Sequence, residues 1–115
     1  KQRPGVSERS QELARTRKQF EAASRTLESR IQEDFLTAQT AAQLTALYEK
    51  AVIPQLGLAL ESSLASYESG TADFLPVLTN AVMLLDYEMN YQEELQNYYL
   101  ALSRLEEMTG RGLTP

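Results

Sequence analysis

The chain has 115 residues, 43% of them hydrophobic and 23% charged, which is the size and balance of one small globular domain. It contains no cysteine and no histidine, so disulfides, thiolate nucleophiles, imidazole bases and the common zinc sites are excluded. No apolar run reaches the ~18–20 residues of a membrane-spanning helix, and the polar opening KQRPG is not a signal peptide. We therefore expect either a cytosolic protein or a piece of a longer one.

The net charge of −5 is unevenly distributed. Residues 1–30 contain eight of the eleven basic side chains and four of the sixteen acidic ones, a local charge of +4. In ELARTRKQFEAASRTLESR the basic residues are interleaved with glutamates, and Phe20 is the one aromatic residue among them. Nucleic-acid binding would require stacking side chains between the basic ones. The pattern therefore favours a solvated helix face, and no nucleic-acid partner is expected.

A long first helix is predicted over residues 7–69, with Ser7 as its N-cap and residues 1–6 as a disordered or loop start. Apolar residues recur every three or four positions, which is the helical period. Pro54 removes a backbone donor and crowds the carbonyl of Lys50, so we expect a kink there, and two helices that break near residue 54 are the alternative. The apolar positions are Leu13, Phe20, Leu27, Ile31, Phe35, Ala38, Ala42, Leu47, Ala51, Leu58, Leu64 and Tyr67.

The stretch SYESGTADFLP interrupts this helical pattern. Gly70 tolerates a positive φ angle and is predicted to end the first helix. Asp73 is predicted as the N-cap of the next helix, because Pro76 then occupies the third helical position, where its missing N–H needs no partner. We therefore assign the hairpin turn to residues 70–73, so that the two helices run antiparallel.

The second helix is assigned to residues 74–109, and residues 110–115, which begin with the helix-ending Gly110, to a C-terminal tail. Its residues form two mainly apolar stripes on adjacent faces with a heptad-like step. This is typical of a helix with neighbours on both sides, although one wide face in a helical bundle predicts the same pattern. The first stripe is Val77, Ala81, Leu84, Glu88, Tyr91, Leu95, Tyr98, Leu102 and Leu105. The second stripe is Leu75, Leu78, Val82, Leu85, Met89, Gln92, Gln96 and Tyr99.

The two predicted helices differ in length, and this difference indicates a partner. At 1.5 Å per residue the first helix is ~90 Å long and the second covers only ~53 Å of it. Nothing in this chain would then bury Leu13, Phe20 and Leu27. We expect another chain, or sequence outside this one, to cover them, and self-association is predicted. The side chains expected to pack between helices are Leu47, Leu84, Tyr91, Leu95, Tyr98, Leu102 and Leu105.

About residues 30–110 resemble the last helical repeat of the TolC-like outer membrane efflux proteins. Each shared motif is weak alone, and the five in order are specific. They are Leu47-Tyr48, Ile53-Pro54-Gln55, Tyr67-Glu68-Ser69-Gly70, Asp73-Phe74-Leu75-Pro76-Val77-Leu78 and Leu105-Glu106-Glu107-Met108-Thr109-Gly110. The chain departs from the family pattern at Thr79-Asn80, where members often carry Asp.

The resemblance implies a coiled-coil-like, all-α hairpin in the periplasm, part of the α-helical barrel of a trimeric efflux channel that meets the outer membrane only through a separate β-barrel part. It further implies that the hairpin tip docks a periplasmic adaptor protein. The tip residues are Tyr67, Gly70, Thr71, Asp73, Phe74, Leu75 and Leu78. No enzymatic activity, cofactor or metal site is expected, because the chain has acidic residues but no histidine and no pocket-forming topology. A self-standing helical scaffold or coiled-coil interaction protein is the alternative.

Overall fold

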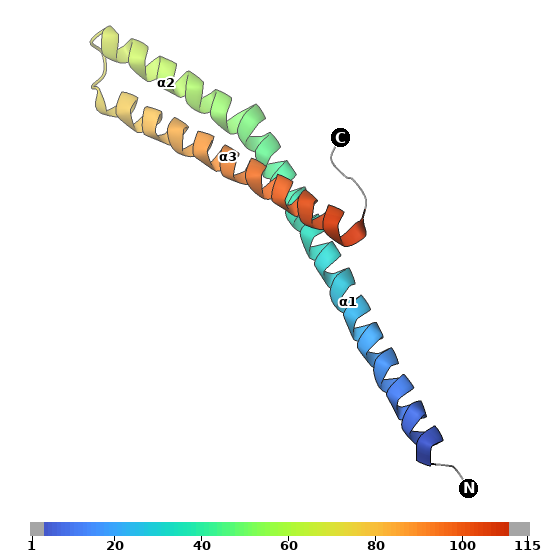
Figure 1. Cartoon of the computed structure of the whole chain (residues 1–115). Helices are drawn as coiled ribbons and strands as arrows, with labels where there is room; N and C mark the ends of the chain where they lie inside the picture. Colours follow the sequence, from blue (N-terminus) through green and yellow to red (C-terminus); the bar gives the residue numbers. More distant parts are fainter. Residues whose placement is uncertain (1–3, 111–115) are drawn as a thin grey trace.

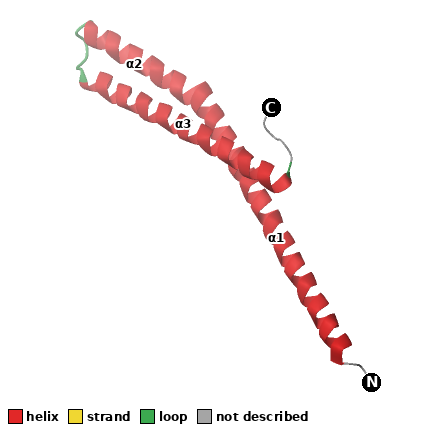
Figure 2. Ribbon diagram, viewed as in Figure 1, coloured by secondary structure: helices red, strands yellow, loops and turns green. Residues whose placement is uncertain are grey.

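The computed structural model describes residues 4–110, and every regular element in that range is helical (Figure 1). No strand occurs among these residues (Figure 2), so the all-α prediction is confirmed. Residues 1–3 and 111–115, which the sequence assigns to the start and the tail, lie outside the described range. The elements are α1 (Pro4–Leu47), the π-helix η1 (Tyr48–Val52), α2 (Ile53–Glu68) and α3 (Leu75–Thr109).

The molecule is an elongated helical hairpin. α2 and α3 lie side by side, and the N-terminal part of α1 continues alone past the end of α3 (Figure 1). The molecule measures 100 × 29 × 14 Å and has a radius of gyration of 26.9 Å, whereas a compact chain of this length would have about 13 Å. Its accessible surface is 9246 Å², against ~6,300 Å² for an ordinary folded monomer of this mass. Much apolar surface is therefore uncovered.

The first helix begins earlier than the sequence predicts. α1 starts at Pro4, three residues before the expected N-cap Ser7. Proline suits the first helical turn, because its missing N–H would have no intrahelical partner there and its fixed φ angle matches the helix. The expected loop start is therefore wrong for residues 4–6, which are helical.

The long helix changes its geometry just before Pro54. In η1 the Ile53 N–H donates to the carbonyl of Tyr48, five residues earlier, which is the π-helical pattern. In an α-helix residue 54 would donate to the carbonyl of Lys50, and proline has no N–H with which to do so. The π turn therefore lies where a hydrogen bond is already lost. The helix direction changes at this segment (Figure 1), and the helical rod continues into α2.

A Schellman motif ends α2 at the tip of the hairpin. Gly70 has a φ angle of +78°, and its N–H donates to the carbonyl of Tyr67 at 3.0 Å. The Thr71 N–H donates to the carbonyl of Ser66 at 2.9 Å. These are the two hydrogen bonds of the motif, and the left-handed conformation that they require is the one expected for Gly70. The non-helical turn that follows covers residues 69–74 (Figure 2).

The second helix begins without the predicted side-chain cap. α3 starts at Leu75, with Phe74 as the residue before it, and no side chain bonds to its first turn. The prediction that Asp73 caps this helix is therefore wrong. The turn is one residue longer at each end than predicted, so that Pro76 moves into the first helical positions, where its lack of an N–H costs nothing. α3 ends at Gly110, whose φ angle is +69°.

The most deeply buried side chains between the two halves of the hairpin are mostly small. Small residues let two helices approach closely, but they bury little apolar surface. The Arg104 guanidinium meets the Asp34 carboxylate at 3.4 Å, near the end of α3. The buried side chains are Ala38, Ala41, Val77, Ala101 and Leu105, of which Ala101 is 0% exposed. The bulkier apolar side chains are therefore at most half-buried, apart from Val77 and Leu105, and many are exposed.

Candidate functional site

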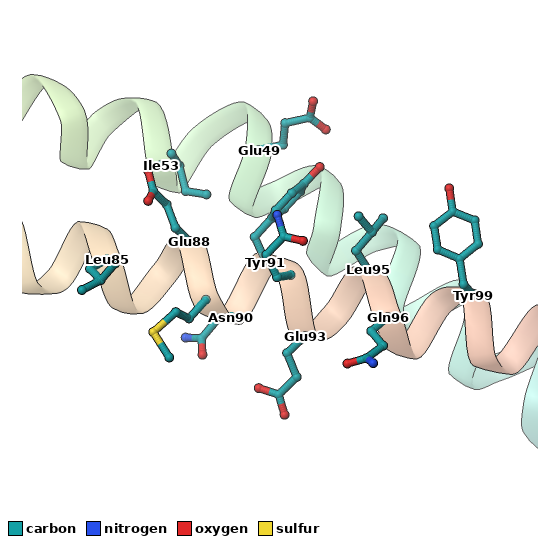
Figure 3. A pocket seen from close by; sticks show the side chains of 12 residues that line it. Glu49, Ile53, Leu85, Glu88, Asn90, Tyr91, Glu93, Leu95, Gln96 and Tyr99 are labelled. Atoms are coloured by element: carbon teal, nitrogen blue, oxygen red, sulfur yellow. The ribbon is translucent and has the colours of Figure 1, made fainter.

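The first stripe of α3 faces the other half of the same chain. In Figure 3, Tyr91 and Leu95 point toward the facing helix. The ring of Tyr87, beside the stripe, meets the ring of Tyr48 edge to face at 5.7 Å. Glu88, the one charged member of the stripe, is exposed. Val77 and Leu105 are buried, and the half-buried members are Ala81, Leu84, Tyr91, Leu95, Tyr98 and Leu102.

Leu47 was expected to pack between the helices, and it lies outside their contact with 51% of its surface exposed. Successive side chains are about 100° apart around a helix. The side chains of α1 and η1 that face α3 occur at steps of three and four, at Ala38, Ala41, Thr45 and Tyr48. Leu47 is one position out of this series and is directed away from α3.

Two other leucines of the predicted apolar series are also outside the hairpin contact. Leu58 and Leu64 are 65% and 41% exposed. Close to the tip the contact uses polar side chains instead, because the Asn80 side-chain amide donates to the Ala59 carbonyl at 3.3 Å and to the Ser63 hydroxyl at 3.2 Å. Asn80 and Ser63 are half-buried. Apolar periodicity does not identify polar contact positions such as Asn80 and Ser63. An Asn within a largely apolar helix is the feature of the sequence that could have indicated a polar contact.

The predicted docking residues lie in and beside the turn at the hairpin tip. All seven, from Tyr67 to Leu78, are exposed. Phe74 and Leu75 are 51% and 69% exposed, and the Phe74 ring meets the Tyr67 ring edge to face at 5.2 Å. The Thr71 hydroxyl is used within the turn, where it donates to the Ser66 carbonyl at 3.1 Å. The tip thus presents an apolar patch on a turn held by internal hydrogen bonds.

The second stripe of α3 is uncovered along its whole length. All eight of its residues are exposed, among them Leu85 at 56%, Met89 at 61% and Tyr99 at 55%. Residues of this stripe line an open groove along α3 (Figure 3). Glu93 and Gln96 point away from the facing helix in this view. The two adjacent stripes therefore have different surroundings, because this chain covers one and leaves the other open.

The N-terminal part of α1 forms a third uncovered surface, which we call the overhang and define as residues 5–30. Apart from the half-buried Ser24, every side chain in this range is exposed. Leu13, Phe20 and Leu27 are 64%, 72% and 43% exposed. This agrees with the overhang expected from the lengths of the two helices.

The described residues offer apolar surfaces and no arrangement for metal binding. Within residues 4–110, no group of three or more histidine, cysteine, aspartate or glutamate side chains is placed to hold a metal ion. In the same range no helix combines the length and apolar character needed to cross a bilayer. Comparisons of the chain with protein-family models, with curated proteins and with solved structures found no match. The tip, the second stripe and the overhang are therefore the candidate functional surfaces of the described residues.

Proposed function

We propose that this chain is the periplasmic helical-hairpin portion of a trimeric outer membrane efflux channel of the TolC-like type, with a tip that docks a periplasmic adaptor protein. The observation that carries the proposal is the uncovered second stripe of α3 beside a covered first stripe. A helix in the wall of a helical barrel has a neighbour on each side and needs two such stripes. The five ordered motifs described above supply the link to this type of channel.

The overhang fits the same proposal. In a channel wall, a second helix stacked end to end with α3 would lie along α1 and cover Leu13, Phe20 and Leu27. Leaving a large apolar side chain in water forgoes ~1.5–3 kcal/mol of burial, so a stable assembly is expected to fill this place. The interior of the hairpin, with its small alanines, suits a thin wall in which most burial comes from neighbouring helices.

Adaptor docking is assigned to the tip because its apolar side chains lie where the chain reverses. Phe74 is half exposed and is held against Tyr67, so it presents an aromatic surface in a defined orientation. Small interfaces depend on a few such anchors. Leu75 and Leu78 extend the patch onto the first turn of α3.

A cysteine cross-linking experiment in cells tests the docking role. These 115 residues contain no cysteine, so Phe74→Cys introduces the one thiol of this segment, at its tip. With a thiol-to-amine cross-linker it should give a product with the adaptor, identified by mass spectrometry. Leu58→Cys is the matched control, because Leu58 is 65% exposed but lies away from the turn. We expect an adaptor product from position 74 and little from position 58.

Two results would overturn the proposal. Equal adaptor cross-linking from both positions would remove the docking role of the tip. If the protein that contains this segment is found in the cytosol, or forms no trimer in the outer membrane fraction, the channel assignment is wrong. That second result would favour the self-standing helical scaffold, in which the uncovered stripes bind other coiled-coil helices.

A further inference from the structure

The two uncovered helical faces of this chain match each other in length and spacing. The overhang is ~39 Å long, and the second stripe of α3 spans ~36 Å from its first to its last residue. The overhang carries its large apolar side chains at intervals of seven, at Val6, Leu13, Phe20 and Leu27. The second stripe has the same interval, at Leu78, Leu85, Gln92 and Tyr99. Matching seven-residue intervals are the pattern by which two helices pack along each other.

The two helices that carry these faces also differ in net charge. The overhang has six basic and four acidic side chains, whereas α3 has six acidic and one basic. Arg9 lies between Val6 and Leu13, and Arg17 lies between Leu13 and Phe20. Each is three or four residues from both of its apolar neighbours, so both arginines flank the apolar row. Asp86 and Glu93 are placed in the same way beside Met89 in the second stripe. These four charged side chains are exposed. Contact of the overhang with α3 therefore brings net positive charge to net negative charge, whereas contact of α3 with its own copy would bring like charges together.

A single chain cannot bring these two faces together. The ion pair between Asp34 and Arg104 joins the two halves of the hairpin near the end of α3, and the overhang projects beyond that end (Figure 1). We infer that two copies of this chain associate antiparallel, with the overhang of each copy lying in the open groove along α3 of the other. The arrangement has two-fold symmetry, so each copy contributes the same two faces.

Registers that keep the two rows together differ by seven residues, and one of them overlaps the overhang with nearly the whole second stripe. Placing Leu13 of one copy against Leu85 of the other also places Phe20 beside Gln92 and Leu27 beside Tyr99, because the spacing is the same on both helices. In this register the tip of each copy lies level with the N-terminal end of the other, and the assembly has three helices in cross-section along most of its length.

The contact is large enough for a stable dimer. A helix about 10 Å wide that lies along ~37 Å of a partner covers a strip of a few hundred Å², and the symmetry repeats it. Counted on both copies this is roughly 1,500 Å², close to the ~1,600 Å² of a standard protein interface. The inference does not depend on the proposed function, since it uses only the two faces. In a channel wall the same faces would contact other helices.

Charge reversal tests the pairing directly. The double variants Arg9→Glu/Arg17→Glu and Asp86→Lys/Glu93→Lys each place like charges across both contacts. Sedimentation velocity over a range of concentrations should show a dimer for the unchanged chain and a dissociation constant raised roughly tenfold or more for either variant alone. An equimolar mixture of the two variants should regain the affinity of the unchanged chain, because opposite charges then meet again. Arg15→Glu/Lys18→Glu is the matched control, since both side chains lie on the far side of the overhang from its apolar row.

Three results would overturn the inference: a monomer at high micromolar concentration, a mixture of variants that does not associate, or a control variant as weak as the others. Cysteines test the register. Leu13→Cys mixed with Leu85→Cys should form a disulfide between copies, whereas Leu13→Cys alone should form little. Efficient cross-linking in Leu13→Cys alone would show instead that overhang pairs with overhang. None of these outcomes involves an adaptor or a membrane, so they are separable from those of the proposed function.

Discussion

Replacing Gly70 by alanine should destabilise the hairpin through the backbone alone. Gly70 has a φ angle of +78°, and a Cβ added there would meet no atom within 4 Å. The cost is therefore conformational. A non-glycine residue in the left-handed backbone conformation costs at least about 1 kcal/mol. With an unfolding entropy of ~2.1 cal/mol/K per residue, a chain of this size should lose about 4 °C in Tm.

Gly57→Ala is the matched control for this change. Gly57 lies inside α2, and a Cβ there would also meet no atom within 4 Å. In a helix interior alanine is more stable than glycine by ~0.5–1 kcal/mol, so the same substitution should raise the Tm. The two unfolding curves are measured by far-ultraviolet circular dichroism at one protein concentration, because association shifts apparent stability. A Gly70→Ala variant as stable as the unchanged chain would refute the role assigned to the left-handed turn.

Three further predictions concern the contact between the helices, and each is checked by denaturant unfolding. Asn80→Ala should cost about 1 kcal/mol through its lost hydrogen bonds, and the effect should shrink when Ser63 is already alanine; an unchanged effect would show that the bond contributes nothing. Ala101→Leu should cost ~1–3 kcal/mol by overpacking, whereas the adjacent and exposed Leu100 should accept alanine with a smaller loss; the reverse order would contradict the burial described. Arg104→Ala should cost ~0.2–1 kcal/mol, since its side chain is largely exposed, and added salt should remove most of the difference; a large, salt-independent loss would indicate a packing role instead.

The course of the chain could be predicted from the sequence because it depends on local chemistry. Helical periodicity follows from side-chain spacing, and the end of the first helix at Gly70 follows from its lack of a Cβ. The same local reasoning failed at Pro4, which is predicted to lie in a loop but begins α1, and at Asp73, which does not cap α3. Proline breaks a helix from within but is tolerated in the first turn, so its position relative to the helix decides its effect.

The packing face could not be predicted in the same way. A period shows that apolar residues share a face, but it does not show which neighbour that face meets. Leu47 and Leu58 belong to the apolar pattern and yet lie outside the hairpin contact, whereas Ala101 and Ser63 lie in or near it and contribute little to a hydropathy signal. At the tip, the exposure of Phe74 could be anticipated from its place beside the turn, since few neighbours in the chain can reach it.

The π-helix η1 has a consequence for how the length of this chain can vary. A π turn contains one residue more than an α-helix needs over the same rise, and it is therefore equivalent to a single inserted residue. Deleting one residue within Tyr48–Val52 should convert η1 into regular α-helix and leave the faces of α1 and α2 in their present orientation. A deletion elsewhere in either helix would turn every later side chain by about 100° and would exchange inner positions for outer ones. Single-residue gaps among related chains should therefore concentrate at η1.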